Sequence, residues 1–230
     1  MNELNSFEKS IDITFKNKNL LLQALTHRSF LNENPAFEVG HNERLEFLGD
    51  AVLELIVTED LYERYPDKPE GELTSFRAAL VNAEMLAKIA VDLDMNKYLL
   101  LSRGEHKDTG RARHYILANA IEALIGALYL DQGYDAVEQF IKKHLLVKID
   151  EVIAKKLWKD PKSTFQEEAQ ERMGITPNYR VIKEVGPDHQ KRFSVGVYVG
   201  NEIFAEGTGA SKQEAEVAAA TSALEKKGWR

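Results

Sequence analysis

Three acidic side chains share one face of a predicted helix in the first quarter of the chain. Glu43, Glu46 and Asp50 lie in the segment HNERLEFLGDAVLELIVTEDLY (41–62), at spacings of three and four residues. At about 100° per residue, they fall within an arc of about 60° on the helix surface. Neighbouring acids repel one another, and hard cations such as Mg²⁺ bind carboxylate oxygens. The spacing therefore indicates a divalent-cation site, with a solvated acidic face as the alternative.

A second predicted helix carries a matching pair of oxygen-bearing side chains. In ILANAIEALIGALYLD (116–131), Asn119 and Glu122 are three residues apart among mostly apolar neighbours. Polar side chains inside a helix this apolar favour a functional role over a solvated face. Gly49, beside Asp50 on the first helix, would let another backbone approach closely. We expect the two helices to pack together and to form one cation site between them.

Helical periodicity runs through the first two thirds of the chain. Apolar residues recur at helical spacing in five stretches, 20–31, 44–65, 71–93, 115–132 and 134–156. On the helix that carries the three acids, the predicted core-facing side consists of Leu45, Leu48, Val52 and Leu55. No alternating strand pattern occurs between positions 5 and 154, so we expect an all-α domain here.

The pattern changes after Trp158. The segment KDPKS (159–163) is charged and contains a proline, as a short linker would. An amphipathic stretch at 163–173 is followed by three segments that favour strands, 178–184, 192–199 and 202–207, and by an Ala-rich helix at 212–226. Glycine-containing turns separate the strands. The order α-β-β-β-α predicts a small α+β domain.

Charge and composition narrow the function classes. The net charge is −7, yet residues 162–230 carry ten basic and ten acidic side chains, so the negative charge lies in the first 161 residues. An acidic region can meet a phosphate backbone if it binds cations. The absence of cysteine excludes disulfides and thiolate metal sites. We find no apolar run of about 18 residues and no signal-peptide layout, so we expect a cytoplasmic protein with no membrane partner.

Several of these segments resemble the ribonuclease III family. NERLEFLGDAVL (42–53) is similar to the family's diagnostic motif, and ILANAIEALIGALYLD is similar to its second catalytic helix. LTHRSF (25–30) and PEGELT (69–74) resemble further family segments in the expected order. The likeness covers essentially the whole chain. It implies a ribonuclease III catalytic and dimerisation domain at 1–155, a linker at 156–161 and a double-stranded-RNA-binding domain at 162–230.

Carried over position by position, the resemblance implies a metal site. Glu46, Asp50 and Glu122 match the family's Mg²⁺-binding acids, and Asp50 and Glu122 are the expected catalytic residues. Asn119 stands at a ligand position that is often Asp in the family. Its amide oxygen can bind Mg²⁺ but supplies no charge, so we expect weaker metal affinity. Mg²⁺, with Mn²⁺ as a substitute, would promote two-metal-type hydrolysis that leaves 5′-phosphate and 3′-hydroxyl ends.

The resemblance also implies supporting residues and a homodimer. Glu43 matches a supporting acid beside the metal site, and Glu70 and Arg103 match residues near the scissile strand. Phe47, between the acids, resembles the family's dimer-contact aromatic, with an ordinary core phenylalanine as the alternative. In the implied homodimer, each nuclease domain cuts one strand of the duplex across a minor groove.

The C-terminal third resembles a domain that reads the shape of double-stranded RNA across two minor grooves. The expected RNA contacts are Ser163, Gln166, Glu167, His189, Lys191, Ser211 and Lys212. The family commonly has a second Lys where this chain has Gln213. We therefore expect weaker binding and a salt dependence that is shallower by about 0.7–0.9 for each lost phosphate contact. Lys191 and Arg192 add positive charge nearby, although both also fit a solvated strand face.

Three functions fit these patterns to different degrees. The first is a Mg²⁺-dependent endonuclease that cuts double-stranded RNA during ribosomal or messenger RNA processing. The second is a weakened or inactive double-stranded-RNA-binding protein of the same fold, which only Asn119 favours. The third, a helical protein-interaction module with an acidic groove, explains the first domain but not the second.

Overall fold

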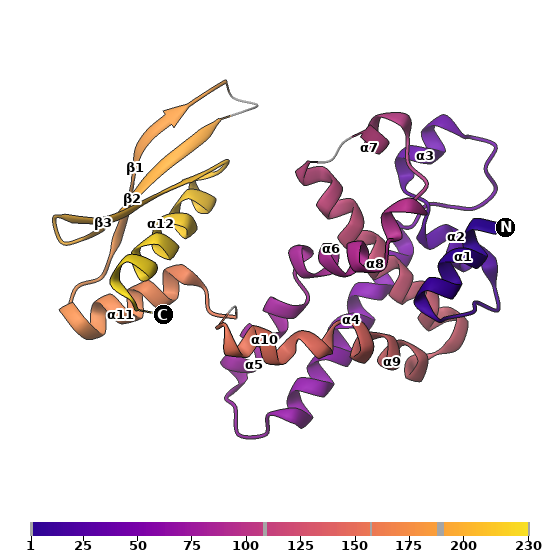
Figure 1. Ribbon diagram of the computed structural model, residues 1–230, viewed down its shortest axis with the longest axis horizontal. Helices are drawn as coiled ribbons and strands as arrows, with labels where there is room; N and C mark the ends of the chain where they lie inside the picture. Colours follow the sequence, from indigo (N-terminus) through magenta and orange to yellow (C-terminus); the bar gives the residue numbers. More distant parts are fainter. Residues whose placement is uncertain (1, 108–109, 157, 188–190, 230) are drawn as a thin grey trace. The chain divides into compact units, whose positions relative to one another are not determined.

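The computed structural model describes residues 2–107, 110–156, 158–187 and 191–229. The chain forms two compact units, Met1–Trp158 and Lys159–Arg230 (Figure 1). None of the described helices combines the length and apolar character that a membrane crossing needs.

The first unit consists of helices, as its apolar periodicity predicts. Its α-helices are α1 (Asn2–Ile11), α2 (Lys18–Ala24), α3 (Arg28–Glu33), α4 (Glu43–Arg64), α5 (Glu70–Leu80), α6 (Ala83–Asp92), α7 (Arg103–Lys107), α8 (Arg111–Gln132), α9 (Tyr134–His144) and α10 (Ile149–Ala154). Two short 3₁₀ helices are η1 (Met95–Lys97) and η2 (Leu146–Lys148). A parallel bridge joins Thr26 to Leu100. The expected all-α fold of this region is confirmed.

Side-chain caps divide two of the expected helices. The stretch 71–93 forms α5 and α6, because Asn82 accepts a hydrogen bond from the Met85 N–H and starts a new helix. The stretch 20–31 forms α2 and α3, where the ring of His27 accepts from the Ser29 N–H. Apolar residues keep their helical spacing across both breaks. Periodicity alone therefore predicted one helix in each stretch, where the caps produce two.

The backbones of α4 and α8 approach closely at two glycines. A Cβ atom on Gly49 would lie 1.7 Å from the backbone oxygen of Glu122. A Cβ atom on Gly126 would lie 2.2 Å from the backbone oxygen of Leu45. No other residue type fits at this distance, so the glycines fix where the two 22-residue helices meet.

The second unit has the predicted α-β-β-β-α order. Its elements are α11 (Pro161–Met173), β1 (Asn178–Val185), β2 (Arg192–Val199), β3 (Glu202–Gly209) and α12 (Lys212–Lys227). The strands form an antiparallel sheet in the order β1-β2-β3, α12 packs on β2 and β3, and α11 packs on α12 (Figure 1). Phe165 and Phe204 lie in the core of this unit, and the ring of Trp229 stacks on Phe165. The expected α+β fold is confirmed.

Candidate functional site

The crossing of α4 and α8 brings together four oxygen-bearing side chains that the sequence singled out. Glu46 and Asp50 extend from α4, while Asn119 and Glu122 extend from α8. The Asn119 amide donates a hydrogen bond to the Glu46 carboxyl, so side chains of α4 and α8 are in direct contact here. Glu122 is close enough to Asp50 and Glu46 to feel both of their charges. The predicted meeting of the two polar helix segments is therefore present.

The carboxyl groups of Glu46 and Glu122 are partly buried, Asp50 is exposed, and the three repel one another. Burial, followed by the charges of Asp50 and Glu46, raises the pKa of Glu122 to about 7. Burial and the neighbouring Glu43 raise the pKa of Glu46, and its hydrogen bond from Asn119 opposes that shift. Burial is the larger cause of both shifts, and the like charges add to it, so negative charge is gathered here without a cationic side chain among the causes of either shift.

The donor set fits a hard divalent cation. Among the residues outside the gaps in the described chain, no three His, Asp or Glu side chains are already gathered as a metal shell. Mg²⁺ does not require such a shell, because it commonly takes one or two carboxylates and completes its octahedron with water and phosphate oxygens. A bound cation would also relieve the repulsion that raises the pKa of Glu122.

Glu43 and Arg103 take different positions around this donor set. Glu43 accepts a hydrogen bond from Arg28 at 3.4 Å, and His41 Nδ1 lies 3.7 Å from its other oxygen. Its charge still raises the pKa of Glu46, so Glu43 borders the site. Arg103 begins α7 with an exposed side chain, and its backbone N–H donates to the Glu33 carboxylate at 3.2–3.3 Å. In the part of the chain that the structure describes, no hydrogen bond or ion pair joins Arg103 to the four donors.

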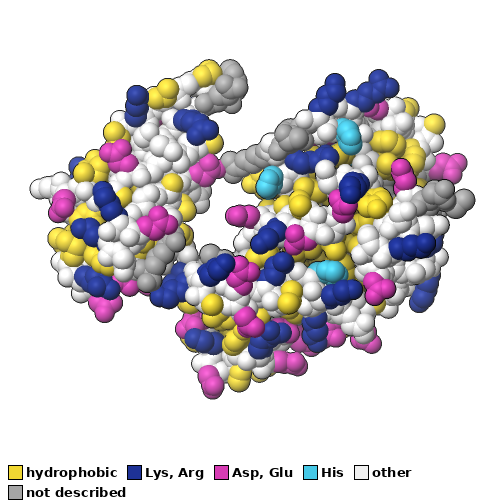
Figure 2. Space-filling model, viewed as in Figure 1, with side chains coloured by type: hydrophobic (Ala, Val, Ile, Leu, Met, Phe, Trp, Pro, Cys, Tyr) yellow, Lys and Arg dark blue, Asp and Glu magenta, His cyan; other side chains and the backbone are white. Residues whose placement is uncertain are grey.

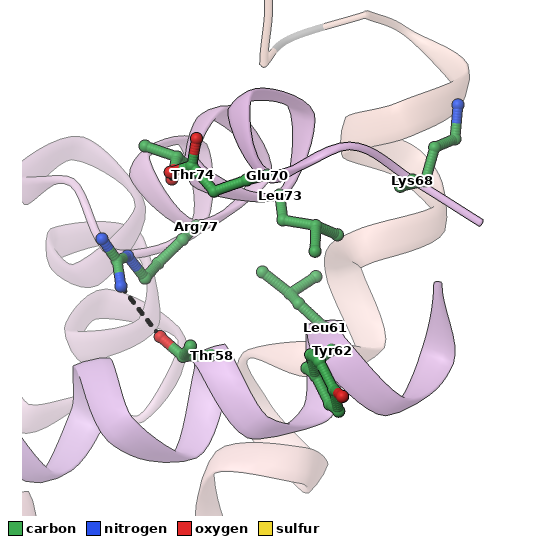
Figure 3. Close-up of a pocket in the computed structure, with 8 residues that line it drawn as sticks. All are labelled: Thr58, Leu61, Tyr62, Lys68, Glu70, Leu73, Thr74 and Arg77. Atoms are coloured by element: carbon green, nitrogen blue, oxygen red, sulfur yellow. Dashed lines mark hydrogen bonds between the residues drawn. The ribbon is translucent and has the colours of Figure 1, made fainter. Parts of the chain in front are cut away.

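Glu70 lies in a pocket rather than with the four donors. The pocket has a volume of about 450 Å³ and is lined by Thr58, Leu61, Tyr62, Lys68, Glu70, Leu73, Thr74 and Arg77 (Figure 3). Glu70 accepts a hydrogen bond from Thr74, and Arg77 donates one to Thr58 at 2.9 Å (Figure 3). Thr58 is eight residues beyond Asp50, which is about 12 Å along a helix. Within one chain, Glu70 is therefore separated from the metal donors.

An exposed apolar strip runs along α4. The exposed fractions are 82% for Phe47, 58% for Leu55 and 74% for Tyr62. At about 100° per residue, these side chains fall within about 80° of one another. The core alternative for Phe47 is wrong, and so is the core-facing position predicted for Leu55. Tyr62 was missed, although its spacing of 15 residues from Phe47 would have placed it on the same face.

The first helix of the second unit presents three of the expected RNA contacts. Gln166 and Glu167 are exposed on α11. Ser163 is also exposed, and its backbone N–H and hydroxyl both donate to the Asp160 carboxylate at 2.9 Å. Asp160 therefore caps α11 and orients the Ser163 hydroxyl. His189, the expected contact from the β1–β2 loop, lies outside the described residues.

Ser211 has a defined structural role at the start of α12. Its hydroxyl accepts a hydrogen bond from the Glu214 N–H at 3.2 Å, and the Glu214 carboxylate accepts one from the Ala210 N–H at 3.0 Å. The Ser211 cap and the Glu214 carboxylate together satisfy two backbone N–H groups at the start of α12, which fixes the first turn of the helix. The side chain that follows, Lys212, is exposed at the helix start.

Lys191 and Lys212 share a carboxylate that the sequence analysis missed. Glu184 lies 3.4 Å from the Lys191 ammonium and 3.5 Å from the Lys212 ammonium. Acidic and basic side chains are interspersed over the face of the second unit in Figure 2. The lysines expected to bind RNA therefore have an acid between them, and the pairing of β1 with β2 places that acid there.

Two family models match successive parts of the chain. A model described as Ribonuclease-III-like matches residues 17–149, and a double-stranded RNA binding motif matches residues 161–227. Ribonuclease 3 of Borreliella afzelii is 45% identical over 222 residues, which cover 96% of this chain and 90% of the relative. Ribonuclease 3 of Natranaerobius thermophilus is 48% identical over 207 residues, which cover 90% of this chain and 89% of the relative.

Solved structures of the nuclease domain of ribonuclease III from Campylobacter jejuni are also similar. One is 40% identical with a TM-score of 0.57, and it covers 65% of this chain and 97% of that structure. A second, described as showing flexibility in the region involved in dimer formation, is 42% identical with a TM-score of 0.55. This second match covers 62% of this chain and 94% of that structure.

Proposed function

This chain belongs to the ribonuclease III family, and from that premise we propose a site, a cofactor and an assembly for its activity as a double-strand-specific endoribonuclease. The family is metal-dependent, and we propose Mg²⁺ as the metal, with Mn²⁺ as a substitute. The observation that carries the proposal is the meeting of Glu46, Asp50, Asn119 and Glu122 where α4 crosses α8.

Each of the four donors has a distinct task in the proposed mechanism. Glu46, Asp50 and Glu122 hold divalent cations through their carboxylate oxygens, and Asp50 and Glu122 are the catalytic pair. Asn119 orients Glu46 through its hydrogen bond and offers its amide oxygen as a further ligand. Bound Mg²⁺ supplies an activated water and stabilises charge on the leaving oxygen, which would give 5′-phosphate and 3′-hydroxyl ends.

We assign the catalytic and dimerisation role to residues 1–155, the linker to 156–161 and duplex binding to 162–230. The exposed strip of Phe47, Leu55 and Tyr62 supports a homodimer, because apolar side chains this exposed commonly mark a protein interface. A twofold axis would give each strand of the duplex its own nuclease domain. The proposed setting is RNA processing in the cytoplasm, including ribosomal and messenger precursors.

The test is incubation of the protein with a long RNA duplex in Mg²⁺, with EDTA as the control. We expect short duplex products with 5′-phosphate ends in Mg²⁺ and none in EDTA. The variant Glu122→Ala should still shift the duplex on a native gel but leave it uncut. Cutting in EDTA, or simultaneous loss of binding and cutting in Glu122→Ala, would contradict the proposed site.

Asn119 favours the second candidate, a catalytically weakened or inactive double-stranded-RNA-binding protein of the same fold. An uncharged ligand lowers the affinity of a site for Mg²⁺, because affinity follows the number of charged ligands. The variant Asn119→Asp should lower the Mg²⁺ concentration for half-maximal cutting, by about fivefold to tenfold. An unchanged Mg²⁺ requirement would show that the amide costs the site nothing.

A further inference from the structure

One end of the second unit's sheet carries a row of three residues, one from each strand. Glu184 of β1 pairs with Phe193 of β2, and Phe193 pairs with Gly209 of β3. A Cβ atom on Gly209 would lie 2.5 Å from the backbone nitrogen of Ala215, so the first turn of α12 rests directly on this end of the sheet. The row therefore lies beside the start of α12, where Lys212 extends.

Two lysines from separate segments meet the carboxylate in this row. Lys212 Nζ lies 5.8 Å from the centre of the Phe193 ring and 3.5 Å from Glu184 Oε1. Lys191, just before β2, has its Nζ 3.4 Å from Glu184 Oε2. The exposed fractions of the three side chains are 37% for Lys191, 59% for Lys212 and 36% for Glu184. Both ammonium groups are therefore accessible to an incoming phosphate while each faces one oxygen of Glu184.

We propose that Glu184 is an intramolecular competitor of the RNA phosphates, and that it limits duplex affinity through Lys191 and Lys212. This inference rests on the proposed role of these two lysines in binding RNA. A carboxylate and a phosphate are both anionic acceptors for the same ammonium donors. A phosphate that binds Lys212 must approach the negative charge of Glu184 and take over a donor that Glu184 already engages.

The opposite effect, in which Glu184 strengthens binding by ordering the lysines, is the smaller one. Ion pairs that are this long and this exposed hold their side chains only weakly, so little ordering is lost when the carboxylate is removed. The repulsion between Glu184 and a phosphate that either lysine holds persists in the complex. A moderated affinity also suits an enzyme that must release a duplex product after cutting, because dissociation can limit turnover.

The test compares three full-length proteins, the unaltered chain, Glu184→Gln and Glu202→Gln. Glu202 is exposed and pairs with Val199, at the far end of β2 from Phe193, about 20 Å away. Both substitutions remove one negative charge, so they differ in its position alone. Binding to an RNA duplex of about 16 base pairs, the length one such domain spans, is measured in EDTA so that the RNA stays intact. Salt is varied between about 50 and 200 mM.

We expect Glu184→Gln to bind the duplex about threefold to tenfold more tightly than the unaltered chain, and Glu202→Gln to match the unaltered chain. The salt dependence of Glu184→Gln should steepen by up to about 0.7–0.9, the value of one phosphate contact regained. In a chain with Lys191→Gln and Lys212→Gln, the gain from Glu184→Gln should disappear. Retention of the gain there would overturn the inference.

Two further outcomes separate this inference from the proposed function. If the unaltered chain binds the duplex while Glu184→Gln binds equally or more weakly, the competitor role is wrong and the proposed function stands. If Glu202→Gln gains as much as Glu184→Gln, the effect belongs to net charge and the inference is again overturned. Absence of duplex binding by the unaltered chain would overturn the proposed RNA-binding role and this inference together.

Discussion

Glu122 is the residue on which the proposed site depends most. Its carboxyl is partly buried and lies near the charges of Asp50 and Glu46, and all three effects disfavour its charged form. A metal ligand must nevertheless be deprotonated to bind. The same side chain therefore destabilises the metal-free fold and stabilises the metal-bound one, which is common where function sets the residue type.

This conflict predicts an effect of pH on stability. The folded pKa of Glu122, about 7, lies above the unfolded model value of 4.5, so its contribution to stability is lost as pH rises through that interval. In EDTA at about pH 8, the free energy of unfolding of Glu122→Gln should exceed that of the unaltered chain. We expect a difference of about 1–2 kcal/mol after allowance for solvent screening. At about pH 4, where the carboxyl is mostly protonated in both states, the two proteins should be nearly equal in stability.

Urea unfolding of both proteins at the two pH values measures the difference. The comparison uses the same protein with and without one ionisable group, so the titration of acids that do not interact with Glu122 cancels. A variant that is no more stable than the unaltered chain at the higher pH would show that Glu122 is not strained by its neighbours.

At the scale of elements, the site depends on how closely α4 and α8 approach. The acids could be found from their spacing in sequence, and Gly49 signalled a close approach. The sequence did not show which backbone approaches Gly49, because a glycine indicates only that space is needed there. Gly126, which makes the reciprocal contact with Leu45, carried no signal of its own.

The variant Gly49→Ala should disrupt this crossing. The new methyl would lie 1.7 Å from the Glu122 backbone oxygen, so the helices must separate and the four donors must move apart. We expect a loss of about 3 kcal/mol or more in the free energy of unfolding, together with loss of divalent-cation binding. Thermal unfolding and cation titration measure the two effects.

Gly71→Ala is the matched control. Gly71 is exposed near the start of α5, and a Cβ atom there has nothing within 4 Å. Alanine favours a helix over glycine by about 1 kcal/mol, so this variant should be slightly stabilised. Equal behaviour of the two variants would show that the crossing tolerates a methyl group.

Apolar periodicity predicted most of these elements, but it did not predict the features that depend on caps, burial or strand pairing. The strands and both helices of the second unit follow from alternation and from the Ala-rich run. The division of 71–93 into α5 and α6 does not, because the Asn82 cap lies within continuous apolar spacing. Leu55 was assigned to the core for a different reason: periodicity shows which face of a helix is apolar but not whether the rest of the chain covers that face. The position of Glu184 beside the two lysines could not be predicted, because it depends on the register between β1 and β2.

At the scale of the whole molecule, the apolar strip on α4 predicts self-association. Phe47→Ala should weaken the homodimer by about 2 kcal/mol or more, because a large exposed aromatic is the kind of side chain that dominates an interface. Analytical ultracentrifugation over a range of protein concentrations measures the dissociation constant. Val91→Ala is the control, since Val91 is 60% exposed on α6, outside the strip.

A monomeric unaltered chain would contradict the proposed dimer. Equal weakening by Val91→Ala would show that the strip is not the interface. The position of Glu70 also bears on the dimer, because Glu70 lies in a pocket away from the metal donors of its own chain. The resemblance that places Glu70 near the scissile strand therefore needs either a second chain or a different role.

Calorimetric titration with Mn²⁺ in the absence of RNA tests the central claim most directly, because it measures the cation site without depending on cutting. The unaltered chain should bind Mn²⁺, with an affinity that increases as pH rises through about 7, where Glu122 loses its proton. Glu122→Gln should lose most of that binding and all of its dependence on pH in this range. Binding of equal strength in both proteins would show that Glu122 does not hold the cation and would contradict the proposed site.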